Sequence, residues 1–207
     1  MNAKTMVYLV LGVLAGTAAL PAKSQTSTNQ TSDSEMMATM MAMAKPGDNH
    51  KQFESMAGEW TYTVKWWMNP QMPPSESTGT TVSKLVMGGR YLISNHTGKI
   101  SMPGADGKMA EVVFEGMAIE GYDNAKKKYV SSWIDNMGTG IENSEGTYDA
   151  AAKTLTYIGS YEPMPGMVTK IRQVGKCIDQ DHHTMEMFED RGGTLVKTME
   201  ISYTRKS

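Results

Sequence analysis

From residue 58 to the C-terminus, apolar and polar residues alternate with a period of two. The segment WTYTVKW at 60–66 places its aromatic and branched residues on one side and its threonines and lysine on the other. Because successive side chains of a β-strand point to opposite faces, this spacing predicts strands rather than helices. A similar segment near the C-terminus has its apolar members at Leu195, Met199, Ile201 and Tyr203.

Eight further strand candidates lie between these two segments, near residues 78–87, 90–101, 111–121, 128–136, 139–148, 154–161, 167–178 and 182–189. Turn-forming sequences separate them, such as Gly88-Gly89 and Arg191-Gly192-Gly193. Short connections favour antiparallel neighbours, and closure of the sheet removes its exposed edges. We therefore expect an all-β fold of about ten strands in an antiparallel up-and-down barrel. A two-sheet sandwich is the alternative.

The N-terminus has the three-part pattern of a secretory signal peptide. Lys4 supplies a short positive region, residues 6–20 are apolar and uncharged, and Pro21-Ala22-Lys23-Ser24 follows. The apolar run is shorter than the roughly twenty residues that a membrane-spanning helix needs. We expect residues 1–24 to be a leader cut before Gln25, leaving an exported protein, periplasmic or secreted, without a stable membrane span. A retained N-terminal anchor is the alternative.

Three segments are expected before the first strand. Residues 25–34 are polar and lack apolar periodicity, which predicts a disordered linker. Residues 35–44 and 50–56 predict two short helices that cap one mouth of the barrel. We expect the barrel domain, including these helices, to occupy 35–207.

Charge and cysteine content exclude several classes of partner and site. The chain has 20 basic and 22 acidic residues, and loss of Lys4 and Lys23 with the leader leaves 18 basic ones. This acidic balance argues against a nucleic-acid or anionic-membrane partner. The only cysteine is Cys177, so we expect neither an internal disulfide nor a thiolate metal cluster.

Several segments resemble the family catalogued as domain of unknown function 1579. They are PGDNHKQFESMAGEW at 46–60, MGGRY at 87–91, GYDNAKKKYVSSWIDNMGTG at 121–140, EGTYD at 145–149 and MEISYTR at 199–205. The resemblance covers nearly all of the chain after the leader. Such proteins are similar to the calycin group of barrels, which includes the lipocalins and the haem-binding nitrobindins. The resemblance implies a calycin-like barrel and no known reaction.

His183 is the titratable residue of most interest. Alternation places it on the face of Met185 and Met187, which we expect to point inward, and places Glu186 outside. A neutral inward imidazole could ligate haem iron, so haem is a candidate cofactor. The alternative is a hydrogen bond to a neighbouring strand at the rim. The face of His96 cannot be assigned from its neighbours.

Five other residues complete the candidate ligand site: Trp60, Arg90, Trp133, Asp135 and Arg172. Trp60 belongs to an inward row. Arg90 could bind a ligand carboxylate, but an ion pair with Asp135 that latches the rim is favoured. Trp133 and Asp135 share one face and either line a pocket or form a core tryptophan beside a turn aspartate. The face of Arg172 is ambiguous.

Standard catalytic signatures are absent from the sequence, including G-x-S-x-G, H-E-x-x-H and a phosphate loop. The methionines of 36–43 suggest Cu(I) chemistry, but packing as a helix stripe is favoured because no His or Cys accompanies them. No catalytic or metal-ligating residue is therefore assigned.

The leading functional expectation is an exported protein that binds a small, mostly apolar ligand inside a lipocalin-like barrel. One alternative is a haem-binding barrel that uses His183. Another is a hydrolase or isomerase with an acid–base pair drawn from Asp135, His183 and Glu186. A third is an interaction module without a ligand. A cavity inside the barrel would favour binding, and a filled interior would exclude it.

Overall fold

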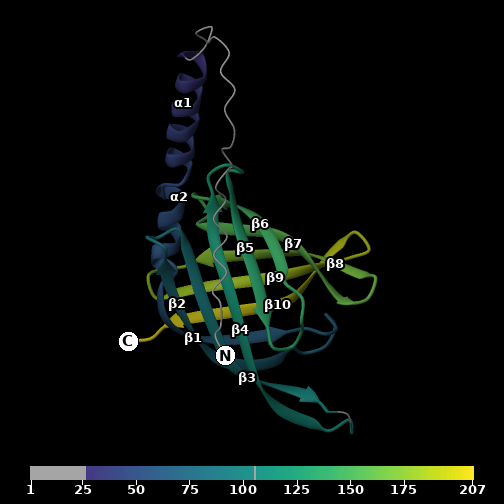
Figure 1. Cartoon of the computed structure of the whole chain (residues 1–207). Helices are drawn as coiled ribbons and strands as arrows, with labels where there is room; N and C mark the ends of the chain where they lie inside the picture. Colours follow the sequence, from purple (N-terminus) through teal and green to yellow (C-terminus); the bar gives the residue numbers. More distant parts are fainter. Residues whose placement is uncertain (1–26, 105) are drawn as a thin grey trace, which may run out of the picture. The chain divides into compact units, whose positions relative to one another are not determined.

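The computed structural model describes residues 27–104 and 106–207 (Figure 1). The leader predicted at 1–24 therefore lies outside the described residues. Contacts divide the chain into two units, Met1–Met40 and Met41–Ser207. No helix in the described ranges is long and apolar enough to cross a membrane.

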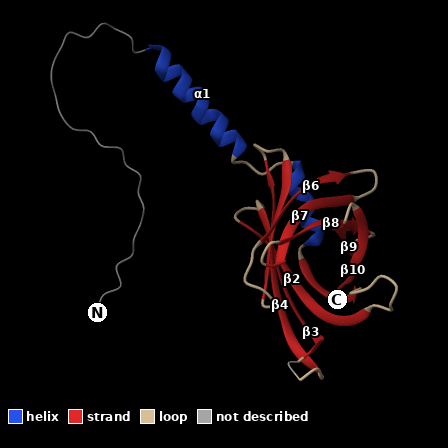
Figure 2. Ribbon diagram, turned by 90° about the vertical axis from the view of Figure 1, so that its right-hand side faces the viewer, coloured by secondary structure: helices blue, strands red, loops and turns tan. Residues whose placement is uncertain are grey.

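Ten antiparallel strands follow one another around a closed barrel, which Figure 2 shows curving round on itself. Their bounds are β1 Gly58–Trp66, β2 Ser75–Val86, β3 Tyr91–Pro103, β4 Met109–Asp123, β5 Lys128–Asp135, β6 Glu142–Asp149, β7 Thr154–Met164, β8 Met167–Cys177, β9 His182–Arg191 and β10 Thr194–Arg205. Each strand pairs with its sequence neighbours, and β1 also pairs with β10. The predicted ten-stranded up-and-down barrel is confirmed, and the sandwich is excluded.

Helices precede the barrel. The first, α1, spans Ser27–Met43, so it begins inside the segment expected to be a disordered linker. Its methionines, expected to pack as a stripe, are exposed. The second predicted helix forms as α2, Asp48–Lys51, followed by the 3₁₀ helix η1, Gln52–Met56.

The helix η1 plugs the end of the barrel at which β1 begins. Phe53 is 0% exposed and packs in one cluster with Leu92, Tyr129, Leu155 and Tyr157 from the strands. Burying one such aromatic side chain contributes on the order of 2 kcal/mol. The Tyr129 hydroxyl also donates to the carbonyl of Asn49 in α2 over 3.2 Å, which ties the helix preceding η1 to β5.

His50 stabilises α2, which leads into η1. Its Nδ1 accepts a hydrogen bond from the backbone N–H of Gly47 over 3.0 Å, and the side chain is buried. Its ring lies edge-on to Tyr122 with centroids 5.8 Å apart. His50 therefore serves the capping of a short helix and the packing of that helix against β4.

A β-bulge in β10 changes which residues face inward. The pairing of β10 with β9 shifts between Lys197 and Met199, so side chains before the bulge change faces. Leu195, expected on the row of Met199, is 47% exposed and pairs with Asp190 on the outer face. The expectation for Leu195 is therefore wrong, because simple alternation assumes an uninterrupted strand.

Candidate ligand cavity

The barrel encloses a cavity of about 1450 Å³, lined by side chains from all ten strands. The lining includes Gln52, Ser55 and Met56 of η1 and residues 137–141 between β5 and β6. The inward row of β1, Trp60, Tyr62, Val64 and Trp66, forms part of the wall, as its alternation predicts. The interior is thus a cavity rather than a filled core.

His183 lies between two aromatic rings on one wall of this cavity. Its ring stacks on Tyr203 with centroids 4.3 Å apart and an 18° angle, and it meets Trp60 edge-on at 4.4 Å. Trp60 is 1% exposed, and its Nε1 donates to the Met56 carbonyl over 3.0 Å. The Arg205 guanidinium covers the indole from 4.0 Å. The predicted inward positions of His183 and Trp60 are what the structure shows.

Burial keeps both cavity histidines neutral. It lowers the pKa of His183 to about 4, with smaller contributions from Arg205 and His96. Burial likewise lowers the pKa of His96 to about 4. The Nδ1 atom of His96 shares a hydrogen bond of 2.8 Å with the Thr81 hydroxyl, whereas His183 forms no hydrogen bond with any described residue. Neither imidazole therefore brings positive charge into the cavity at neutral pH.

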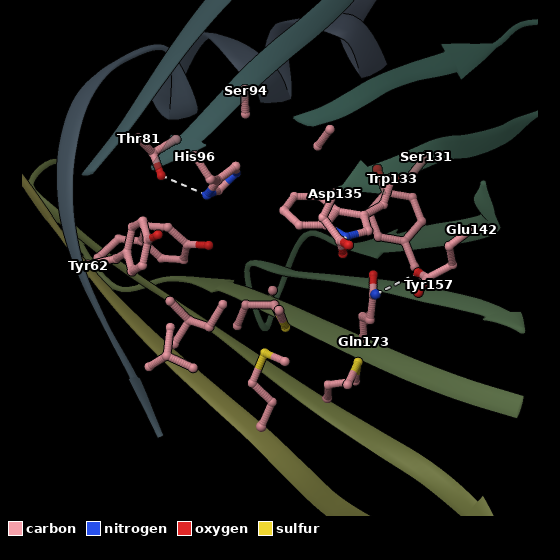
Figure 3. A pocket seen from close by; sticks show the side chains of 18 of the residues that line it. Tyr62, Thr81, Ser94, His96, Ser131, Trp133, Asp135, Glu142, Tyr157 and Gln173 are labelled. Carbon is pink, nitrogen blue, oxygen red and sulfur yellow. Dashed lines mark hydrogen bonds between the residues drawn. The ribbon is translucent and has the colours of Figure 1, made fainter. Parts of the chain in front are cut away.

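Trp133 and Asp135 lie together on the facing wall (Figure 3). The indole Nε1 donates to Asp135 Oδ2 over 2.8 Å, and the backbone N–H of Met137 donates to Oδ1 over 2.9 Å. The indole edge also faces His96, with centroids 5.2 Å apart. Of the two interpretations left open by the sequence, the pocket-lining one matches this placement.

Gly116 provides the space for this indole. It pairs with Asp135 across β4 and β5, and a Cβ on Gly116 would lie 2.5 Å from the Trp133 ring. Any larger residue would therefore displace the indole from its position against the wall.

Two further carboxyl groups face the cavity. Glu142 Oε1 accepts a hydrogen bond from Gln173 Nε2 over 2.9 Å (Figure 3). Burial raises the pKa of Glu142 despite that hydrogen bond, and the nearby Asp135 charge raises it further. Burial also raises the pKa of Glu120.

The Tyr157 hydroxyl is a polar group on the same side of the barrel that the protein satisfies incompletely. Tyr157 is 6% exposed, and its hydroxyl forms no hydrogen bond of full geometry with any described atom. Burial raises its pKa well above the usual value, and the neighbouring Glu120 carboxyl adds to the rise. The Glu120 carboxyl interacts with this hydroxyl, and side-chain hydrogen bonding between them raises the pKa of Tyr157 and lowers that of Glu120, although the contact falls short of full hydrogen-bond geometry. Tyr157 also pairs with Gln173 across β7 and β8, so its side chain lies beside the amide that binds Glu142.

Arg90 lies outside the cavity, at the turn between β2 and β3. Its Nε and Nη2 donate to the Ala44 carbonyl over 3.0 and 2.7 Å, and Nη1 donates to the Met87 carbonyl over 2.8 Å. The expected ion pair with Asp135 does not form, because this turn is at the opposite end of the barrel, and Arg90 is not part of the cavity wall. Arg90 instead links Ala44, which precedes α2, to the turn between β2 and β3.

Arg172 also lies outside, which resolves its ambiguous face. Its guanidinium lies 4.8 Å from the Phe188 ring centroid on the outer wall, while Gln173 takes the inward position in β8. Glu186 is on the outer wall too, where it pairs with Lys197 over 2.7 Å. Arg172 and Glu186 therefore cannot reach a ligand in the cavity.

Sequence reasoning missed the cavity residues Glu120, Glu142, Tyr157 and Gln173. In β4 the hydrophobic pattern misleads, because apolar Ile119 is on the outer face at 43% exposure while Glu120 points inward. Glu120 faces inward because it pairs with Ser131, which lies two residues before Trp133 and therefore on the same face of β5. Knowledge of strand register was needed to identify it.

A family model described as "Protein of unknown function (DUF1579)" matches residues 45–205, and the chain belongs to this family. The crystal structure of Rv2717c from M. tuberculosis is similar in fold, with a TM-score of 0.53 and 15% identity over 79% of this chain and 100% of that one. A DUF3598-family protein of unknown function from Nostoc punctiforme aligns with a TM-score of 0.26 and 7% identity, over 78% of this chain and 100% of its own. No curated protein matches the sequence.

Proposed function

We propose that this DUF1579-family protein binds a small, mostly apolar ligand inside its barrel. The observation that carries the proposal is the cavity of about 1450 Å³. Pockets for drug-sized ligands commonly measure roughly 300–1000 Å³, so this cavity has room for a larger, extended molecule. Burial of apolar ligand surface is the main source of binding free energy in such a site.

One wall offers the apolar surface that such a ligand needs. Met185, Met187, Met199 and Ile201 from β9 and β10 line the cavity beside Val64. Unbranched thioether side chains adapt their shape to a ligand at low cost. This wall suits chain-like or ring-containing apolar groups without demanding one shape.

The hairpins at the end of the barrel away from η1 favour access by an apolar molecule. They carry exposed apolar side chains at Met68, Met72, Met109, Met137, Ile141, Met164, Met167, Val168 and Leu195. A ring of such residues on five separate hairpins exceeds what isolated surface apolar residues explain. We propose that the ligand enters and leaves at this end.

Titration with the neutral fluorescent probe N-phenyl-1-naphthylamine tests the proposal. Ala118 lines the cavity next to Trp133, whereas Ile119 points outward, so Ala118→Trp places an indole inside the cavity and Ile119→Trp is the matched control. We expect saturable binding that weakens at least tenfold in Ala118→Trp alone, with circular dichroism confirming the fold of both variants. Absence of saturable binding, or equal binding by both variants, would overturn the proposal.

A haem-binding barrel is the second candidate, and His183 favours it. His183 lines the cavity, is neutral at pH 7 and has no hydrogen-bond partner among the described residues, so it fits the role of an axial ligand. Bound haem would supply redox or gas-binding chemistry. The test is a Soret band on titration with haemin that is lost in His183→Ala, together with the mass of the complex by native mass spectrometry. No band in the unaltered protein excludes this candidate.

An acid–base enzyme receives less support from the geometry. Glu186 is on the outer wall, and both oxygens of Asp135 already accept hydrogen bonds from Trp133 and Met137. His183 forms no hydrogen bond with a described acid. We therefore propose no reaction.

We also propose that the protein is exported, on the strength of the leader pattern at 1–24. The mass of the protein purified from its own host tests this. A chain that begins at Gln25 is the expected result, and a full-length chain in the cytoplasm would contradict it. The same measurement would reveal a co-purifying ligand.

A further inference from the structure

We propose that the ligand is a cationic amphiphile, an apolar molecule with one ammonium group, and that Asp135 and Glu142 hold this group beside Trp133. The inference rests on the proposed binding function and specifies the class of ligand. We call Asp135 and Glu142 the carboxylate pair.

The carboxylate pair lies on adjacent strands and faces the cavity. Asp135 ends β5 and Glu142 begins β6, and Glu142 pairs directly with Trp133. Each carboxylate accepts hydrogen bonds that fix its position, from Trp133 to Asp135 and from Gln173 to Glu142. The site is therefore preorganised, and its remaining lone pairs can accept N–H bonds from a ligand.

No protein cation neutralises this pair. Within the described ranges no Lys or Arg side chain lies within ion-pairing distance of Asp135, Glu142 or Glu120. The lysines that border the cavity are exposed: Lys99, Lys153 and Lys176. Both side chains are partly buried, and charge withdrawn from water is costly unless it is paired, so we infer that a cation from outside the chain is the missing component.

Another carboxylate of the cavity wall, that of Glu189, has partners within the protein. Glu189 also lines the cavity, but it pairs with Arg191 over 3.0 Å and accepts a hydrogen bond from Tyr161 over 3.0 Å. The contrast sets Asp135 and Glu142, which have no cationic partner among the described residues, apart from Glu189.

The Tyr157 hydroxyl is a further polar group of the cavity that the protein satisfies incompletely. It is buried, lines the cavity beside the Glu120 carboxyl and forms no hydrogen bond of full geometry with any described atom. Buried hydroxyls are rarely left without a partner, so a partner from the ligand is expected. An ammonium has three N–H donors, enough to serve the Tyr157 oxygen as well as a carboxylate.

Aromatic rings complete the recognition of a cation. Trp133 stands next to the carboxylate pair, with Phe114 stacked 6.3 Å from it and His96 edge-on at 5.2 Å. Ring faces attract ammonium groups, and indole does so most strongly. An apolar tail would then extend toward the methionine wall of β9 and β10.

Three probes with the same alkyl chain and different head groups test the inference: dodecylamine, dodecanol and dodecanoate, each below its micelle concentration. Their affinities are measured by displacement of N-phenyl-1-naphthylamine at pH 7. We expect dodecylamine to bind at least tenfold more tightly than dodecanol, and dodecanoate to bind weakest.

The double variant Asp135→Asn, Glu142→Gln should lose the preference for the amine and keep its affinity for dodecanol. Glu145→Gln is the matched control, because Glu145 is on the outer face of β6 and pairs with Lys126 over 2.8 Å. Circular dichroism and dodecanol affinity establish that the double variant is folded.

The outcomes separate the two proposals. If no probe displaces the dye and the dye itself does not bind, the binding function is wrong. If the dye and dodecanol bind but dodecylamine is no tighter than dodecanol, or the double variant keeps the amine preference, the binding function stands and the cationic ligand is wrong.

Discussion

The indole of Trp133 donates from Nε1 to the Oδ2 atom of Asp135 over 2.8 Å, two residues further along the same strand. Residues at this spacing share one face of a strand, so both side chains point into the cavity. The contact orients the ring and occupies one carboxylate oxygen. It is the structural link between the aromatic and the acidic parts of the site.

Replacement of Trp133 by Phe keeps an aromatic ring and removes the N–H donor. Asp135 Oδ2 then loses its described partner on the cavity wall, so we expect the free energy of unfolding to fall by about 1–3 kcal/mol. Urea denaturation followed by circular dichroism measures the change. Trp67→Phe is the control, since Trp67 contacts Lys197 on the outside of the barrel. Equal stability of Trp133→Phe and the unaltered protein would show that the bond contributes nothing.

Addition of a methyl group at Gly116 should displace the Trp133 ring. A Cβ there would lie 2.5 Å from the indole, so the ring or the strand must move, at a cost of roughly 1–3 kcal/mol. A shift in tryptophan emission should accompany the loss of stability. Gly138→Ala is the control, because a Cβ at Gly138 meets no atom within 4 Å. Unchanged stability and emission in Gly116→Ala would contradict the close packing described above.

Local pattern was enough to predict the barrel, because alternation and turn residues are properties of short segments. The inward rows of β1 and β9, with Trp60 and His183, followed from the same pattern. Leu195 was placed on the wrong face because a bulge in β10 shifts the pairing, and a bulge has no reliable signature in a single sequence.

The polar part of the site was harder to predict, because its members are recognised by pairing between strands. Glu120 and Glu142 reach the wall through the register with Ser131 and Trp133. An inward carboxylate also breaks the rule that apolar residues face the interior, so hydrophobic pattern alone assigns it outside. Arg90 and Arg172 were proposed for their chemistry, whereas their backbone positions place them outside the cavity.

Truncation of Phe53 should unseat the plug formed by η1. Phe53 is fully buried among Leu92, Tyr129 and Leu155, so Phe53→Ala removes a large side chain and leaves a void. Such substitutions typically cost about 3–5 kcal/mol. Thermal and urea unfolding measure the loss, and Met68→Ala, at an exposed site, is the control. A loss no larger than that of Met68→Ala would mean that η1 is not an integral part of the barrel core.

The neutral histidines of the cavity predict that acid destabilises the protein. Burial lowers the pKa values of His96 and His183 from 6.5 to about 4, so between these pH values the unfolded chain binds protons that the folded chain does not. The free energy of unfolding therefore falls as the pH is lowered from 6.5 to 4, by up to about 3 kcal/mol for each histidine. Glu120 and Glu142 act in the opposite direction over part of this range, because burial raises their pKa values.

A comparison of variants isolates the histidine contribution from that of the carboxyl groups. In His96→Gln and in His183→Gln, the loss of stability between pH 7 and pH 4 should be smaller than in the unaltered protein, because one proton-binding difference has been removed. Urea denaturation at half-unit steps of pH gives each slope. His182→Gln is the control, since His182 is exposed on the outer face and pairs with Asp179 over 2.8 Å. If both cavity variants keep the slope of the unaltered protein, the histidines are not held neutral by burial.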